Sequence, residues 1–132
     1  MTSEPGASSP SERVREGIAL FNRGAFFECH EVLESAWLEA SGDDKTFLQG
    51  LIQVAVSFYH LRQSNYAGAG RLLRAGIDKL SGCQASQHHP VDLGVADIGD
   101  LLGQLHSLLE QIEAGRARPE TSAPEIRLHP VS

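Results

Sequence analysis

Two apolar stretches with helical spacing constrain the fold of this chain more than any other feature. They are residues 21–34, FNRGAFFECHEVLE, and residues 49–60, QGLIQVAVSFYH. In the first, Phe26, Cys29 and Leu33 recur on one helical face, and the second is apolar almost all round, as in a central buried helix. Outside residues 124–128, no segment has the alternating pattern of a strand. The sequence therefore predicts an all-α protein, a compact bundle of about five helices built from helix hairpins.

Capping and breaking residues divide the chain into helices. Ser11, which follows Pro10, is predicted to cap the first helix, and Gly24 is available for a left-handed turn at its end. The fifth helix is predicted to start after Asp97 and to end at Gly115. The second to fifth helices are predicted over residues 25–40, 43–63, 66–80 and 98–114, with Ser81 and Gly82 ending the fourth.

The length of 132 residues corresponds to one domain. Residues 1–10 are rich in Ser, Pro and Gly and are predicted to be disordered, because they have almost nothing to bury. Residues 11–115 form the predicted helical bundle. Residues 116–132 contain three prolines and are predicted to be an extended tail lying across the bundle.

Charge and composition narrow the classes of partner. Eleven Lys and Arg against seventeen Asp and Glu give a net charge of −6. A chain of this charge is expected to bind neither nucleic acid nor an anionic membrane, which call for a basic face. The apolar runs are shorter than the roughly 20 residues of a membrane span, and the start lacks the pattern of a signal peptide. The two cysteines make no disulfide framework, so we expect a cytoplasmic protein.

A weak internal repeat relates the two halves of the bundle. Shifting the sequence by forty residues superposes Phe21 on Leu61, Phe26 on Tyr66 and Leu33 on Leu73. This predicts two equivalent helix hairpins. The same shift places Glu31 and Glu34 on Arg71 and Arg74, so acidic and basic edges would pair if the second and fourth helices lay side by side.

Polar residues interrupt both apolar stretches at helical spacing. His30 and Glu34 fall on one side of the second helix with Glu31 beside them, and Gln49, Gln53 and His60 form a stripe along the third. If the two faces meet, a buried polar cluster results between the helices. Its predicted members are Glu28, His30, Glu31, Glu34, Trp37, Gln49, Gln53 and His60.

Three interpretations of this cluster compete. The structural one is a hydrogen-bonded network that fixes helix register, with Trp37 in the core. The second is a divalent metal site formed by His30, Glu34 and His60, because bundles hold metals with imidazole and carboxylate ligands one turn apart. The third is acid–base catalysis by His30 or His60 with Glu34 as the orienting partner. The structural interpretation is preferred.

The same residues carry a family resemblance. The pattern FNxGxFFExHExLExxW, followed by QGLIQxAVxxYHxxxxNxxGAxxLL, resembles the domain of unknown function 309 family over about residues 19–80. The resemblance implies a compact bundle of about five helices without an established biochemical activity. The positions that match the motif are Gly24, Phe27, Glu28, His30, Glu31, Glu34, Trp37, Gln49, Gly50, Gln53, His60, Asn65 and Gly68.

These observations favour a binding or interaction module over an enzyme. The expected partner is a protein or a small-molecule ligand, and no cofactor is predicted. The alternative is a metal-dependent or His/Glu-based hydrolase that uses the cluster between the helices. A homo-oligomer is a third hypothesis, because the third helix is apolar almost all round and five short helices would leave part of this surface uncovered.

Overall fold

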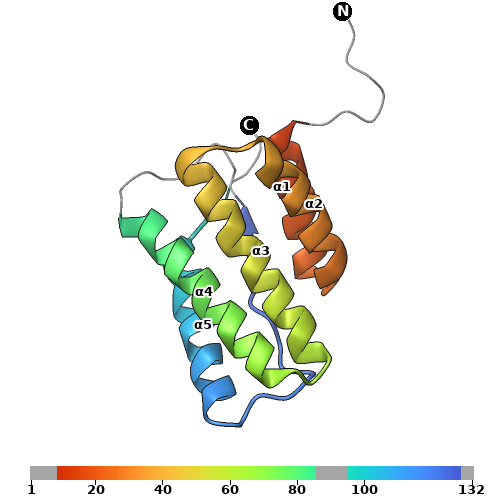
Figure 1. Ribbon diagram of the computed structural model, residues 1–132, viewed down its shortest axis with the longest axis vertical. Coiled ribbons are helices and arrows are strands. Elements are labelled where there is room, and N and C mark those ends of the chain that lie inside the picture. The colour runs from red at the N-terminus through yellow and green to blue at the C-terminus, as the bar shows by residue number, and fades with distance from the viewer. Residues whose placement is uncertain (1–8, 86–94, 129–132) are drawn as a thin grey trace, which may run out of the picture.

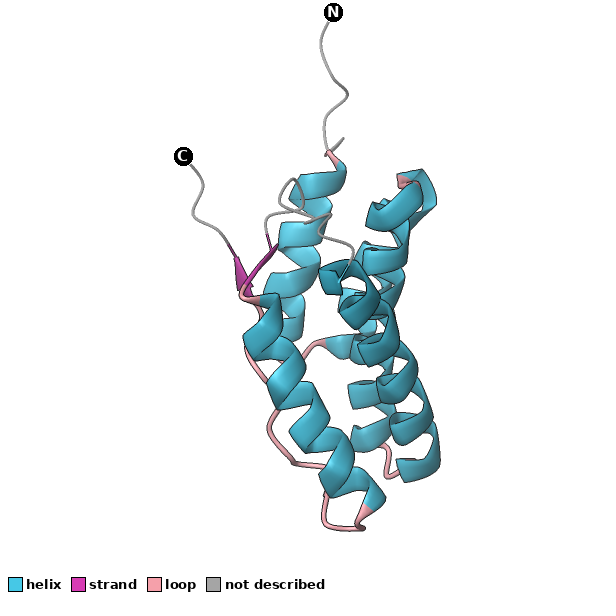
Figure 2. Ribbon diagram, turned by 90° about the vertical axis from the view of Figure 1, so that its left-hand side faces the viewer, coloured by secondary structure: helices cyan, strands magenta, loops and turns pink. Residues whose placement is uncertain are grey.

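The computed structural model describes residues 9–85 and 95–128 of the chain. Five helices make up most of this part, and their order is shown in Figure 1. They are α1 Pro10–Asn22, α2 Phe26–Glu39, α3 Gly42–Arg62, α4 Tyr66–Ala85 and α5 Ile98–Glu113. Two short strands, β1 Val95–Ala96 and β2 Arg127–Leu128, pair antiparallel beside the start of α5 (Figure 2). The predicted all-α class is confirmed. The predictions for residues 1–8, 86–94 and 129–132 lie outside the described residues.

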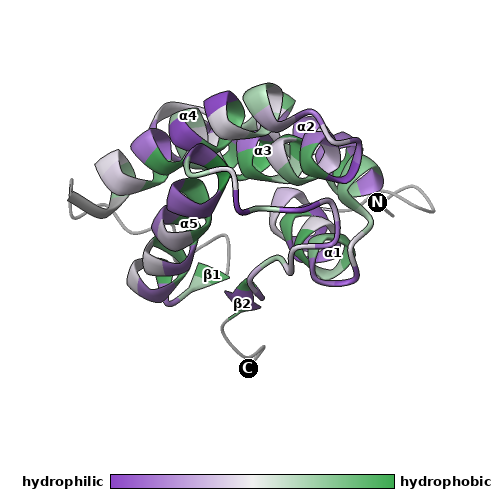
Figure 3. Ribbon diagram, turned by 90° about the horizontal axis from the view of Figure 1, so that it is seen from below, coloured by the Kyte–Doolittle hydropathy of each residue, from purple (hydrophilic) through white to green (hydrophobic). Residues whose placement is uncertain are grey.

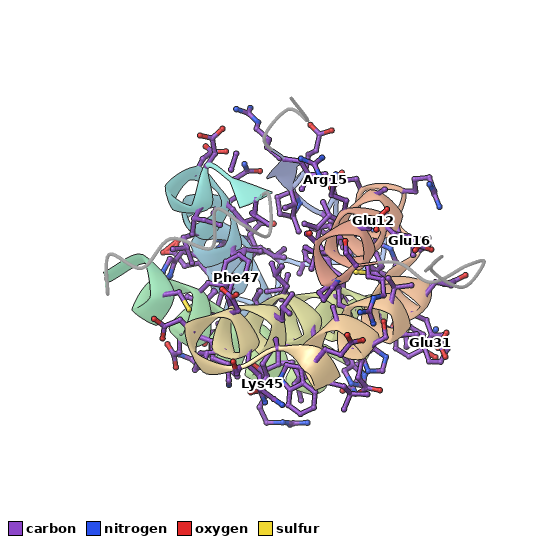
Figure 4. All side chains as sticks on the ribbon, turned by 90° about the horizontal axis from the view of Figure 1, so that it is seen from above. Glu12, Arg15, Glu16, Glu31, Lys45 and Phe47 are labelled. Atoms are coloured by element: carbon purple, nitrogen blue, oxygen red, sulfur yellow. The ribbon has the colours of Figure 1, made fainter. Side chains whose placement is uncertain are left out.

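The helices form two layers (Figure 3). One layer contains α2, α3 and α4, with α3 in the middle, and α1 and α5 lie against its inner side. Figure 4 shows Phe47 of α3 pointing into the space between the layers and Lys45 pointing outward. The rings of Phe21, Phe26 and Phe58 join α1, α2 and α3 in this core, with centroids 5.2–5.6 Å apart. The outer side of the three-helix layer has no helix packed on it among the described residues.

The hairpins α1–α2 and α3–α4 turn in the same way. Five backbone hydrogen bonds at the first turn each recur forty residues later, as in the pairs Gly24–Phe21 and Ser64–Leu61. Gly24 and Ser64 also share a left-handed conformation, with φ of 82° and 60°. The predicted repeat is therefore present in the backbone as two equivalent hairpins.

The start of α1 differs from the prediction. Ser9, and not Ser11, caps this helix: its hydroxyl accepts a bond from the Glu12 amide at 3.1 Å, and the Glu12 carboxylate accepts from the Ser9 amide at 2.8 Å. Pro10 occupies the first helical position, where its missing N–H costs nothing. The prediction placed the cap after the proline because Pro10 was assigned to the disordered N-terminal segment.

The end of α4 also differs, because the helix runs through Ser81 and Gly82 to Ala85. Leu80 and Cys83 on either side are both buried. An interior glycine costs a helix about 1 kcal/mol relative to alanine, and burial of the flanking side chains offsets this. The predicted stop at Ser81–Gly82 is wrong for that reason.

Residues after α5 return between α1 and α5, on the inner side of the layer (Figure 3). Gly115 ends α5 in a left-handed conformation, as predicted. The Asn22 amide donates to the Ile126 carbonyl at 2.9 Å and accepts from the Ile126 amide at 2.8 Å. Arg62 donates to the carbonyls of Pro119 and Thr121. The tail is therefore fastened to the ends of α1 and α3.

Asp97 takes the position before α5 but does not cap the helix as predicted. It makes no side-chain capping bond and has a φ of 57°. Its carboxylate lies 3.2 Å from Arg127 Nη1 on the paired strand instead. The ion pair joins the residue after β1 to β2 in place of the expected cap.

Candidate functional site

The outer junction of α2 and α3 gathers the polar residues expected from the sequence. The α2 helix contributes His30 and Glu34, and the α3 stripe contributes Gln49 and His60. Two adjoining cavities lie along this junction. One has a volume of about 200 Å³ and is lined by Phe26, Phe27, His30, Val56, Tyr59 and His60. The other, about 140 Å³, is lined by Glu34, Trp37, Gln49 and Ile52. We call this surface the α2–α3 groove.

His30 and Glu34 form the ionisable pair of the groove. His30 Nε2 lies 3.6 Å from Glu34 Oε2, one helical turn away. The His30 side chain is 29% exposed and that of Glu34 is 56% exposed. Water screens a pair this accessible, so its contribution to stability is at most about 1 kcal/mol. A carboxylate beside an imidazole can orient the ring, as the acid–base interpretation requires.

His60 interacts with the turn that follows α3. Asn65 Nδ2 lies 3.2 Å from His60 Nδ1, and Asn65 Oδ1 accepts a bond from the Gly68 amide at 3.0 Å. Asn65 thus caps the first turn of α4 and joins it to the last turn of α3. This contact gives His60 a structural role, which agrees with the preferred interpretation.

Trp37 lies in the groove and not fully in the core. Its side chain is half-buried, and the Lys45 ammonium lies 4.2 Å from the centre of its ring. The Trp37 Nε1 and Gln53 Oε1 atoms are buried without a hydrogen-bond partner in the described part of the chain. A buried donor without a partner costs about 1–3 kcal/mol, so the network is incomplete as it stands.

The polar cluster is not buried, which corrects the prediction. Glu28, Glu31, Glu34 and Gln49 are exposed, and the other predicted members are half-buried. Helical periodicity places a residue on the side towards a neighbouring helix, but two cylinders in contact leave an open groove along their outer edge. Side chains there face one another and water at the same time.

The predicted pairing of acidic and basic edges is also wrong. Helix α3 lies between α2 and α4, so these helices are not neighbours (Figure 3). Arg74 instead pairs with Glu113 of α5. The forty-residue relation predicts equivalent positions in two hairpins but not contact between them.

The predicted metal ligands do not converge in this structure. His30 and Glu34 are adjacent, but over residues 9–83 and 95–128 no three His, Cys, Asp or Glu side chains are grouped so as to hold a metal ion. A structural or catalytic zinc needs at least three protein ligands. The metal site formed by His30, Glu34 and His60 stays a prediction.

Sequence reasoning missed the two aromatic walls of the groove. Phe27 is 51% exposed and Tyr59 is 39% exposed, with ring centroids 5.9 Å apart. Phe27 directly follows the core residue Phe26, and Tyr59 directly follows the core residue Phe58. Each therefore lies outside the buried apolar face of its helix. An aromatic residue out of phase was the signal that could have identified them.

Comparisons with known proteins agree with the family resemblance of the sequence. Residues 14–72 match the profile of a domain of unknown function (DUF309). An uncharacterized protein of Bacillus subtilis (strain 168), YpuF, is 45% identical over 89 residues, which cover 67% of this chain and 49% of that protein. An uncharacterized protein of Aquifex aeolicus (strain VF5) is 23% identical over 111 residues, 83% of this chain and 32% of that protein. This chain therefore spans half or less of the length of these relatives. The resemblance to the DUF309 family is thereby confirmed over residues 14–72.

Proposed function

We propose that the chain is a protein-binding module that docks a partner segment on the α2–α3 groove. The observation that carries the proposal is the apolar cavity of about 200 Å³ between Phe26, Phe27, His30, Val56, Tyr59 and His60. Phe27 and Tyr59 flank it and are the exposed aromatics of these two helices. Aromatic side chains in small, apolar pockets are the usual anchors of protein interfaces.

The size of the cavity favours a protein over a cofactor. Pockets for small molecules and cofactors have volumes of about 300–1,000 Å³. A cavity of about 200 Å³ is below this range, but it accommodates one large apolar side chain. A single inserted side chain, surrounded by weaker contacts that exclude water, is a common energetic centre of an interface.

The charge around the groove defines the partner further. Glu28, Glu31 and Glu34 are all exposed along α2. Of these, Glu34 lines the groove. A partner segment with one large apolar residue flanked by Lys or Arg would complement both the apolar cavity and the acidic surface of α2. Such charges chiefly raise the association rate and the specificity.

The test uses displayed peptides of defined composition. One library carries Leu, Phe or Trp flanked by Lys and Arg, and a second carries the same residues flanked by Asp and Glu. We expect selection from the basic library alone, with binding weakened about tenfold or more by Phe27→Ala, as for a typical interface anchor. Leu38→Ala is the matched control, because Leu38 is 67% exposed on the same helix and lines neither cavity. Selection from neither library, or equal binding to the Phe27→Ala variant, would refute the proposal.

A second copy of the chain is the occupant expected from the homo-oligomer hypothesis. Light scattering at two concentrations tests it, because a dimer through this groove should dissociate in the Phe27→Ala variant.

In the described residues no helix is long and apolar enough to cross a membrane. A cytoplasmic location stays part of the proposal, supported by the low cysteine content of the sequence.

A further inference from the structure

Residues of α4 and α5 line a second cleft. Helix α4 lies at the opposite edge of the three-helix layer from α2 (Figure 3). The volume of the cleft is about 430 Å³. Its lining includes Tyr66, Arg71 and Arg74 of α4 and Glu113 of α5. It also includes Gly70 and Ile112, which we call the floor because a Cβ atom at Gly70 would contact Ile112. This volume falls within the usual range for small-molecule sites of about 300–1,000 Å³.

We propose that this α4–α5 cleft binds a small organic anion, whose phosphate or carboxylate group is held by Arg71 and Arg74. The apolar body of the ligand lies on Ile112 and against the ring of Tyr66. The charges, the shape of the floor and the volume of the cleft support this assignment, which is independent of the proposed protein-binding groove.

The charge of the cleft is unbalanced. Arg71 and Arg74 are three residues apart on one helix, where side chains are neighbours. Arg74 pairs with Glu113, whereas the Arg71 guanidinium has no hydrogen bond or ion pair with the described part of the chain. Two adjacent guanidinium groups with one carboxylate leave one positive charge in a chain of net charge −6. An anion placed between them would neutralise this charge and accept paired hydrogen bonds.

The floor of the cleft explains why an organic anion fits better than a bare ion. A Cβ atom at Gly70 would lie 3.4 Å from Ile112 Cγ2, so glycine leaves open the space into which a larger side chain would project. Ile112 is half-buried and Tyr66 is 38% exposed, which leaves apolar surface beside the two arginines. A ligand with a ring or alkyl chain next to its charged group would cover this surface.

The experiment is a titration followed by amide NMR shifts of the full 132-residue chain. The probes are phenyl phosphate and phenylacetate, with phenol and inorganic phosphate as controls that lack the charge or the ring. We expect one or both organic anions to shift amides around residues 66–74 and 112–113. Phenol should bind at least about tenfold more weakly, because one charge-assisted bond corresponds to roughly that factor. Inorganic phosphate should also bind more weakly, because it leaves the apolar surface of Tyr66 and Ile112 uncovered. The better of the two anions identifies the charged group.

Three variants test the assignment. Arg71→Gln removes an exposed cation and should weaken binding about tenfold or more, and Gly70→Leu should abolish binding by filling the floor. Arg23→Gln, an exposed arginine at the α1–α2 turn, should leave binding unchanged. The circular dichroism spectrum of each variant checks that it is folded. Binding of neither organic anion, binding as strong with inorganic phosphate, or binding unaffected by Arg71→Gln would overturn the proposal.

Discussion

Asn65 shows how one side chain can account for several polar residues of the motif at once. Its amide caps α4 through the Gly68 backbone and lies against His60. A Cβ at Gly68 would lie 2.6 Å from Asn65 Nδ2, so the glycine makes room for the cap. His60, Asn65 and Gly68 are therefore one structural unit at the α3–α4 turn.

Asn65→Ala should lower the free energy of unfolding by about 1–2 kcal/mol, the usual cost of a lost cap. Asn65→Ser keeps a capping oxygen but removes the amide beside His60, so it should retain most of the stability. Urea denaturation of the three proteins measures both effects. If the serine variant were as unstable as the alanine variant, the contact with His60, and not the cap, would be the main role of Asn65.

Cys29 is a buried core thiol, and burial raises its pKa to about 12. Because the thiolate is the reactive form, Cys29 should resist iodoacetamide in the native state and react rapidly in urea. The folded-state pKa lies above the unfolded value of about 8.5. The thiol therefore stabilises the fold fully below that pH, and this contribution is lost as the pH rises towards 12. Mass spectrometry of the alkylated protein reports the reaction, and rapid native labelling of Cys29 would contradict the assignment.

His30→Gln distinguishes the binding module from the hydrolase alternative. Since the His30–Glu34 pair is accessible, the substitution should change the free energy of unfolding by less than about 1 kcal/mol. Protein purified without a His-tag should contain no stoichiometric metal, and EDTA should leave its melting temperature unchanged. Stoichiometric zinc or iron that is lost in the variant would instead support a metal site formed by His30, Glu34 and His60.

At the scale of the helices, glycines set the distance between α3 and α4. A Cβ at Gly76 would lie 2.9 Å from both the Gly50 carbonyl oxygen and Val54 Cγ2, whereas a Cβ at Gly82 on the same helix would meet nothing within 4 Å. The backbones of α3 and α4 therefore touch at Gly50 and Gly76. A methyl group there requires the helices to separate.

Gly76→Ala should destabilise the protein by about 1–3 kcal/mol, the usual cost of overpacking a core. Gly82→Ala is the matched control and should stabilise it by about 0.5–1 kcal/mol, since alanine is the better helix former. Thermal and urea denaturation of both variants give the comparison. Equal effects of the two substitutions would show that helix propensity alone, and not contact with α3, determines the outcome at Gly76.

The helices were predictable because their signals are local. Apolar periodicity located all five, and Gly24 and Gly115 adopt the left-handed turns expected of them. Errors arose where packing outweighed a local signal, as at Gly82, or where two signals competed, as at Pro10. The α2–α3 groove could be predicted only in part. Helical periodicity gives the side of α2 on which His30 and Glu34 lie, but it does not show how far the neighbouring helices exclude water from these side chains.

At the scale of the whole molecule, the contacts of the tail could not be predicted. Asn22 and Ile126 are separated by 104 residues, yet they exchange two hydrogen bonds. An asparagine at a helix end usually indicates a local cap or turn, and nothing in its spacing indicates a distant backbone partner. The forty-residue repeat likewise could not predict the order of α2, α3 and α4 within one layer.

Asn22 bonds to both backbone groups of Ile126, as a neighbouring strand would, and Ile126 is buried. Asn22→Ala should therefore release the tail and lower the free energy of unfolding by about 1–3 kcal/mol, at 0.5–1.5 kcal/mol for each hydrogen bond. Limited proteolysis should cut residues 116–128 faster in this variant, and urea denaturation gives the energy. Arg127→Ala is the control, because it removes only the exposed pair with Asp97, worth at most about 1 kcal/mol. If the control loosened the tail as much as Asn22→Ala, the strand pair, and not Asn22, would hold the tail between α1 and α5.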